Sequence, residues 1–262
     1  MKIKDIFFKT KEPVSLTKKI INLSLVFLIL IFIIIYSFIK IDYSVNFAQL
    51  FDYNSKLIQG ILTTILISFF ALIFSLILGI ILTFLRNSKF LPFVYFSKIY
   101  VLFIRNTPLL VQIFLFFYIM GTAFNINNRY FLAPIILSIF SGAYISEIIR
   151  SGLNSIDSRQ IETSISLGFN KFQIYIYIII PQLVRIILPT LSGQFISLIK
   201  DSSLLSVISV NEITKTIEEV NSLTFRVIEN YLVLAAIYLI LTIPIDYLSR
   251  YLEKRYSFGY KD

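Results

Sequence analysis

Four charged residues lie within or at the edges of long apolar stretches, where a charge is expensive to hold: Arg105, Glu147, Lys200 and Asp201. Charges in such places usually line a polar cavity or pair with one another. Both signs are present, so the set could bind a small zwitterion, with a basic side chain on its carboxylate and an acidic one on its ammonium. Lys200 and Asp201 are neighbours, which point about 100° apart on a helix and therefore cannot share one face. The alternative is that all four form structural ion pairs.

The missing residue types narrow the chemistry. The chain has no Cys and no His, which removes disulfides, thiolate chemistry and the commonest general base and metal ligand. No glycine begins a G-x-x-x-x-G-K-[ST] phosphate loop. We therefore predict no catalytic residues, no metal site and no ATP bound in that manner. A membrane-embedded enzyme would need a carboxylate pair or a serine–lysine dyad, and no such catalytic spacing occurs.

The elements that position the charges are predicted to be membrane-spanning helices. Of 262 residues, 57% are hydrophobic and 15% charged, with a mean hydropathy of +0.82. Several stretches reach the roughly 18 apolar residues of a membrane span. Pro108 and Pro189 fall within or at the start of spans and can kink them. The expected fold is an all-α polytopic membrane protein with about six transmembrane helices, at 20–39, 57–85, 99–120, 131–149, 186–208 and 230–249.

The distribution of basic residues predicts the orientation of these spans. With the N-terminus in the cytoplasm, 17 of the 24 Lys and Arg residues fall in inside segments and 5 in outside segments. Both termini are therefore expected in the cytoplasm, and the net charge of +9 reflects topology rather than nucleic-acid binding. The apolar run from Ile20 to Ile39 is too long for the core of a signal peptide, so we interpret it as a retained anchor.

Small residues recur every three or four positions along the second span, which places them on one helix face. They are Gly60, Thr64, Ser68, Ala71, Ser75, Gly79 and Thr83. In lipid, small residues allow helix backbones to approach closely. We expect this helix to pack against other helices along its whole length.

The longest inside segment, residues 150–185, is predicted to form two short helices with a tight corner. Asp157 and Asn170 each stand three residues before a Gln, as in a capping box. Gly168 lies between them, where a left-handed helix C-cap would occur. Pro181 is expected to end the second helix. Such an element on the cytoplasmic face is well placed to contact a partner.

The spacing in this segment resembles a known family motif, the E-A-A-x3-G-x9-I-x-L-P loop of ABC importer permeases. The matching residues are Glu162, Thr163, Ser164, Gly168, Ile178, Ile180 and Pro181. Two alanines are replaced by Thr163 and Ser164 and a leucine by Ile180, all conservative in size or polarity. The resemblance implies a pair of coupling helices that docks on a separate ATPase subunit dimer, which would use ATP and Mg. No cofactor is then expected on this chain.

Three further stretches, 105–112, 141–150 and 194–204, look like the polar amino-acid branch (the histidine/glutamine type) of these permeases. The resemblance implies a permease subunit that forms the pathway for a polar amino acid delivered by an external binding protein, beside an identical or homologous second permease. It also implies a pathway that passes these residues: Arg105, Thr107, Glu147, Lys200 and Asp201. A permease for another solute, such as a betaine, a methionine-type ligand or an oxyanion, remains an alternative, as does a non-transporting scaffold.

The resemblance runs from about Ile61 to the C-terminal end and implies a domain organisation. Residues 1–56 would hold a basic cytoplasmic N-terminus, an extra span and an external loop. Residues 57–249 would form the five-helix permease domain, with its coupling loop at about 157–182. Residues 250–262 would be a cytoplasmic tail in a protein of the bacterial plasma (inner) membrane.

Overall fold

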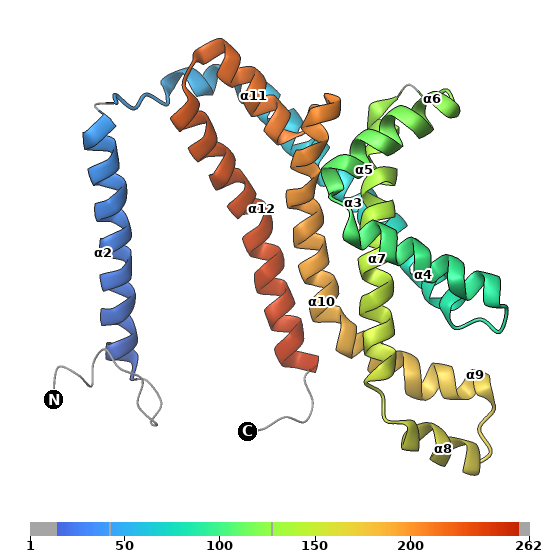
Figure 1. Ribbon diagram of the computed structural model, residues 1–262. Coiled ribbons are helices and arrows are strands. Elements are labelled where there is room, and N and C mark those ends of the chain that lie inside the picture. The colour runs from blue at the N-terminus through green and yellow to red at the C-terminus, as the bar shows by residue number, and fades with distance from the viewer. Residues whose placement is uncertain (1–14, 42, 127, 257–262) are drawn as a thin grey trace. The chain divides into compact units, whose positions relative to one another are not determined.

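The computed structural model describes residues 15–41, 43–126 and 128–256, and all regular structure in these ranges is helical (Figure 1). The α-helices are α2 (Leu16–Ile41), α3 (Asn54–Arg86), α4 (Leu91–Asn106), α5 (Leu109–Leu115), α6 (Gly121–Ala123), α7 (Arg129–Asn154), α8 (Ser158–Ser166), α9 (Lys171–Ile174), α10 (Ile180–Asp201), α11 (Ile213–Thr224) and α12 (Val227–Tyr256). Shorter helical turns are η1 (Ala48–Tyr53), η2 (Phe116–Met120), η3 (Tyr175–Ile179) and η4 (Ser202–Ile208).

Five helical stretches in the described ranges are long and apolar enough to cross a membrane, and the bent pair α4 and α5–α6 adds a sixth if counted as one span. Each of the six predicted spans falls within one of them. The chain divides into two units, one ending at Asn46 and the other beginning at Phe47. The first unit contains α2, which buries none of its residues and is apolar on nearly every side. Such a helix suits lipid on all faces.

The small-residue face of α3 is buried along its whole length, as predicted. Towards the C-terminal end of α3 it packs on α7, and a Cβ at Gly79 would lie only 2.6 Å from Ile145 Cγ2. Near the start of α3 it meets α11, where the hydroxyl of Thr64 accepts a hydrogen bond from the backbone N–H of Ile213 at 3.0 Å. Small side chains thus bring two different helices close to the α3 backbone.

The predicted single span at 99–120 is wrong in its geometry, because the chain bends by 113° between α4 and the stretch Leu109–Ala123. Pro108 has no N–H, so the carbonyl of Ile104 loses its helical partner. The side chain of Gln112 replaces it, donating to the Ile104 carbonyl at 2.8 Å and to the Thr107 hydroxyl at 2.6 Å. The expected kink at Pro108 is confirmed. Hydropathy alone does not predict how large the bend is, since the helices on both sides of it are apolar.

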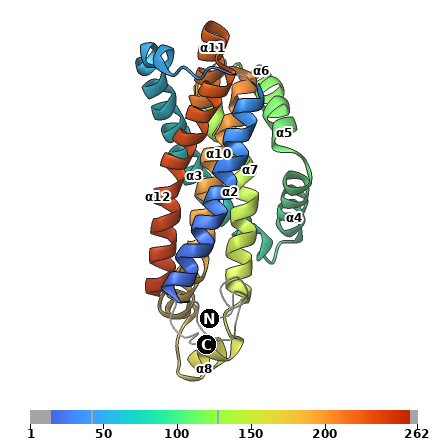
Figure 2. The same cartoon turned by 90° about the vertical axis from the view of Figure 1, so that its left-hand side faces the viewer.

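The segment predicted to be cytoplasmic has two short helices, α8 and α9, at the end of the second unit where α7 finishes and α10 starts (Figures 1 and 2). The prediction that Pro181 ends the second helix is wrong. The chain passes from α9 through the wide π-helical turn at 175–179 directly into α10, with Pro181 in the first turn of α10. A proline is tolerated in a first turn, where its missing N–H is not required. Pro189 likewise lies inside α10, which continues through it.

The close approach of α3 and α7 at Gly79 generates a stability prediction. Gly79→Ala places a methyl group 2.6 Å from Ile145 Cγ2 and 3.1 Å from the backbone nitrogen of Ser146, so the helices must separate. We expect a loss of about 1–3 kcal/mol in the free energy of unfolding. The melting temperature of the full chain in detergent measures this. Gly193→Ala is the control, because nothing lies within 4 Å of its added Cβ. Equal melting temperatures for both variants would contradict the packing argument.

Candidate functional site

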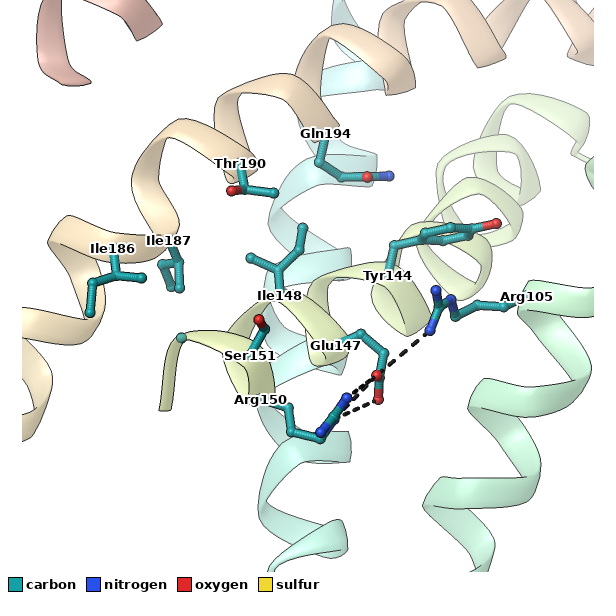
Figure 3. A pocket seen from close by; sticks show the side chains of 11 residues that line it. Arg105, Tyr144, Glu147, Ile148, Arg150, Ser151, Ile186, Ile187, Thr190 and Gln194 are labelled. Carbon is teal, nitrogen blue, oxygen red and sulfur yellow. Dashed lines mark hydrogen bonds and ion pairs between the residues drawn. The ribbon is translucent and has the colours of Figure 1, made fainter. Parts of the chain in front are cut away.

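One carboxylate binds three arginines near the C-terminal end of α7. Arg150, one turn further along α7, donates from Nη2 to Glu147 Oε2 at 2.8 Å. Arg105, at the end of α4, places Nη1 3.6 Å from the same oxygen. Arg86, the last residue of α3, donates to Glu147 Oε1. These four residues, here called the arginine cluster, join the ends of three helices (Figure 3 shows Arg105, Glu147 and Arg150).

The arginine cluster carries two more positive charges than negative ones. Each guanidinium has five N–H donors, and a single carboxylate cannot occupy the donors of three arginines. The Glu147 side chain is only 17% exposed, whereas that of Arg105 is 44% exposed. Arg105 is therefore the member with the freest donors, and the cluster can accept a further anionic group without losing its internal contacts.

A hollow of about 490 Å³ lies between α7 and α10, with Arg105, Glu147 and Arg150 of the arginine cluster on one wall (Figure 3). The Arg105 guanidinium sits 5.5 Å from the ring centroid of Tyr144, a cation–π arrangement that fixes its direction. Thr190 and Gln194 of α10 supply polar groups to the opposite wall, and Ile187 is part of the apolar floor. Size and polarity suit a small polar solute with a negatively charged group.

Lys200 and Asp201 do not join the arginine cluster. The helices α7 and α10 run in opposite directions and meet where Gln194 Nε2 donates to Ser141 Oγ at 3.1 Å. Glu147 lies six residues beyond Ser141, and Asp201 lies seven residues beyond Gln194 in the other direction. At about 1.5 Å of rise per residue, roughly 20 Å separates the two carboxylates along the helix axes. Asp201 is half-buried and Lys200 is exposed.

Thr107 lies in the break between α4 and α5, where its hydroxyl donates to the Phe103 carbonyl at 2.9 Å and accepts from Gln112. These contacts stabilise the bend that carries Arg105 to Glu147. Of the five residues expected along a pathway, the structure thus brings Arg105 and Glu147 together, and Thr107 positions Arg105.

The corner between α8 and α9 has the predicted local geometry at most positions. Asn170 and Gln173 form a reciprocal capping box, and Gly168 has a φ of +82°. Asp157 caps α8 through the N–H of Arg159. No capping box forms there, because the Gln160 side chain instead accepts a hydrogen bond at 2.7 Å from Gln182 of α10. This contact ties α8 to α10.

The motif residues of this corner differ in exposure. Ser164 is buried and its hydroxyl donates to the Gln160 carbonyl, whereas Glu162, Thr163 and Pro181 are exposed and Ile178 is half-buried. Large apolar side chains surround them on the surface: Ile165, Leu167, Phe172, Tyr175 and Tyr177. Ile165 and Leu167 lie outside the candidate spans, whereas Phe172, Tyr175 and Tyr177 lie in the stretch that leads into α10. Exposed apolar side chains outside a span are typical of a contact with another protein.

The carboxyl of Asp157 lies beside this surface. Hydrogen bonds from the Arg159 side chain and backbone hold its pKa below the usual range. Both residues therefore remain charged at neutral pH, so α8 begins with a charged pair next to the exposed apolar side chains.

The sequence analysis missed Arg86 and Arg150 as partners of Glu147. Arg86 enters the sequence analysis only among the basic residues of inside segments, and Arg150 there and as the last residue of the stretch 141–150. The spacing of Glu147 and Arg150, three residues apart on one helix, is a signal that could have identified that pair. Nothing in the sequence relates Glu147 to Arg86, 61 residues away.

Glu212 was also missed. It is fully buried between spans, caps α11 through the N–H groups of Thr214 and Lys215, and accepts from the Tyr238 hydroxyl at 3.3 Å. Burial raises the pKa of its carboxyl to about 7. Its contacts connect α11 to α12, far from the arginine cluster along the chain, and give it a structural role as a helix cap.

The family model "Binding-protein-dependent transport system inner membrane component" matches residues 75–258. A probable glutamine ABC transporter permease protein of Bacillus subtilis is 36% identical over 215 residues, which cover 82% of this chain and 100% of the relative. An L-cystine transport system permease protein of the same organism is 36% identical over 198 residues, 75% of this chain and 84% of the relative.

Solved structures agree with these matches. An amino acid ABC transporter crystallised with histidines has a TM-score of 0.75 and 33% identity over 81% of this chain and 100% of that chain. An inward-facing methionine ABC transporter shares the fold, with a TM-score of 0.65 and 15% identity over 77% of this chain and 96% of that chain.

These matches confirm the resemblance to ABC importer permeases and the all-α polytopic fold. A permease of this kind is a multi-pass protein of the bacterial inner membrane and not itself an enzyme, since ATP hydrolysis takes place in a separate chain. It works with that ATPase and with a substrate-binding protein. The chain belongs to the family of binding-protein-dependent transport system inner membrane components.

Proposed function

We propose that this permease forms the pathway for a polar amino acid. The observation that carries the proposal is the arginine cluster on the wall of the hollow between α7 and α10. The relatives named for glutamine and L-cystine, and the related structure crystallised with histidines, support an amino acid rather than a betaine or an oxyanion.

The hollow offers partners for both charged groups of an amino acid. Arg105, with its freer donors, would take the carboxylate, while the amide oxygen of Gln194 and the hydroxyl of Thr190 on the opposite wall would accept from the ammonium. Gln194 and Thr190 of α10 can hydrogen-bond a polar side chain. Asp201 and Lys200, roughly 20 Å further along the same α10, would act at an earlier stage of passage from the outer side.

The assembly around this chain is also a proposal. A second permease, identical or homologous, would complete the wall beside Ile186 and Thr190, which are exposed in the single chain. A dimer of the ATPase would use ATP and Mg²⁺, and this chain would bind neither. The binding protein would deliver the amino acid from outside.

We further propose that α8 and α9 are the coupling element. Glu162, Thr163 and Ser164 of α8, the corner at Gly168, and Ile178 with Pro181 at the entry to α10 would form the part that docks on the ATPase. The exposed apolar side chains around these residues support the assignment.

Both termini are proposed to be cytoplasmic. The C-terminal end of α12 lies at the same end of its unit as α8 and α9 (Figures 1 and 2). If that pair docks on the ATPase, the C-terminus is on the same side. The basic residues before α2 support the same side for the N-terminus.

The orientation can be measured with single cysteines in this Cys-free chain. Ser15, Ser55 and Ser158 are exposed in the structure, so Cys at each should be reachable by a thiol reagent. With a membrane-impermeant reagent on intact cells, we expect labelling at position 55 alone. Labelling at position 158 would place α8 outside and contradict both the orientation and the coupling role.

The pathway can be tested by removing its charges. Asp201→Asn keeps the size of the side chain, and Arg105→Gln keeps a shorter polar one. Each deletes a hydrogen-bonding charge worth about 1.5–3 kcal/mol, or about ten- to a hundredfold in uptake. Amino-acid uptake by the reconstituted complex is the measurement. Arg250→Gln is the control, because its pair with Asp246 is exposed near the end of α12. Normal uptake by both variants and by Glu147→Gln would refute the pathway.

The coupling role depends on the backbone at Gly168. Its φ of +82° costs a residue with a Cβ about 1–2 kcal/mol, and nothing within 4 Å would obstruct the side chain itself. Gly168→Val should therefore distort the corner, while Gly168→Asn, which tolerates this conformation, should retain it. We expect the Val variant to insert in the membrane but to lose substrate-stimulated ATP hydrolysis. Wild-type stimulation by Gly168→Val would exclude this corner as the coupling element.

A further inference from the structure

A second hollow lies on the other side of the arginine cluster, between α3, α4 and α7. Its volume is about 410 Å³, and Arg105, Tyr144 and Glu147 form the wall that it shares with the first hollow. Arg86 and Lys98 line only this second hollow. The proposed amino-acid pathway makes no use of it.

Positive charge dominates the second hollow. Three cations, Arg86, Lys98 and Arg105, face one carboxylate, Glu147, which is also bonded to Arg150. Lys98 lies 5.6 Å from the ring centroid of Tyr95, and within the described ranges no carboxylate approaches its ammonium within 4 Å. Asn106 adds an amide to the same wall. The hollow therefore has donors and charge for an anion with several acceptor oxygens, such as a phosphate group.

The position of the second hollow indicates where the phosphate comes from. Arg86 is the last residue of α3, so the hollow lies at the level where this span leaves the membrane. The apolar side chain of Leu102, which is 65% exposed, lies at its edge, and the neighbouring Ile99 and Phe103 of α4 are exposed beside it. Anionic headgroups occur at this depth, with acyl chains beside them, and basic pockets between spans on this side bind them.

We propose that the hollow between α3, α4 and α7 binds the phosphate of an anionic phospholipid from the cytoplasmic leaflet. Arg86 and Lys98 hold the phosphate oxygens, beside the Arg105 guanidinium that the two hollows share, and the acyl chains lie along Leu102. A free phosphate would contact the basic side chains but not the apolar edge of the hollow. A phospholipid would contact both, so it fits the site better.

Lys98→Gln tests this assignment, since Lys98 lines the second hollow and not the first, and it forms no ion pair with another described residue. The full chain in detergent is titrated with phosphatidylglycerol or phosphatidylcholine, and bound lipid is counted by native mass spectrometry. We expect phosphatidylglycerol to bind more tightly than phosphatidylcholine. We also expect Lys98→Gln to weaken phosphatidylglycerol binding by about fivefold, from the loss of one basic residue near the headgroup. Lys98→Arg should retain it.

Lys89→Gln is the matched control. Lys89 is exposed in the turn between α3 and α4 and does not line the hollow, but it carries the same charge on the same side of the membrane. Equal weakening by Lys89→Gln and Lys98→Gln would reduce the effect to general surface attraction and overturn the proposal. Inorganic phosphate that displaces the lipid in the millimolar range would assign the cations to free phosphate instead. Neither readout involves amino-acid transport, so the pathway and the lipid site can fail separately.

Discussion

The Glu147 carboxylate receives arginines from three helices, and the arrangement of the surrounding bundle depends on this convergence. Arg86 ends α3, Arg105 ends α4, and Arg150 follows one turn later on α7. Without the carboxylate, three guanidiniums would repel one another where the ends of their helices converge. With it, they form a single wall that separates two hollows, one toward α10 and one toward α4.

Arg105 reaches this wall only because the chain bends sharply at Pro108. A bend in lipid exposes backbone carbonyls, and each one left without a donor costs several kcal/mol. The Gln112 side chain removes this cost at Ile104, because it donates a hydrogen bond to the Ile104 carbonyl. The same amide nitrogen also donates to the Thr107 hydroxyl. The main role of the polar residues around Pro108 is therefore to stabilise the bend. Their value to the site is indirect, because they hold Arg105 beside Tyr144 and Glu147.

Features that depend on neighbouring residues, such as helix faces and caps, could be predicted from the sequence. Contacts between segments far apart in the chain could not. The buried face of α3 follows from small residues at helical spacing, and the left-handed turn at Gly168 follows from cap chemistry. Hydropathy located the third span but not its bend, since it sums apolar residues regardless of direction. Glu147 was identified as a candidate, but its partner Arg86 lies 61 residues away and needs the fold. Pro181 was misread because the sequence does not reveal a π-helical turn before it.

The two helices that enclose the first hollow are also the two that flank the corner formed by α8 and α9. Helix α7 ends at Asn154 and α8 begins at Ser158, so only three residues connect the two helices, and the last of them, Asp157, caps α8. On the other side of the corner, Gln182 of α10 donates a hydrogen bond to Gln160 of α8. Helix α9 also continues into α10 through η3 without a break. In the proposed importer, a displacement of the corner by the ATPase therefore reaches both α7 and α10. Since Arg105 would bind the solute from one wall and Gln194 from the other, separating these walls would release a solute held between them.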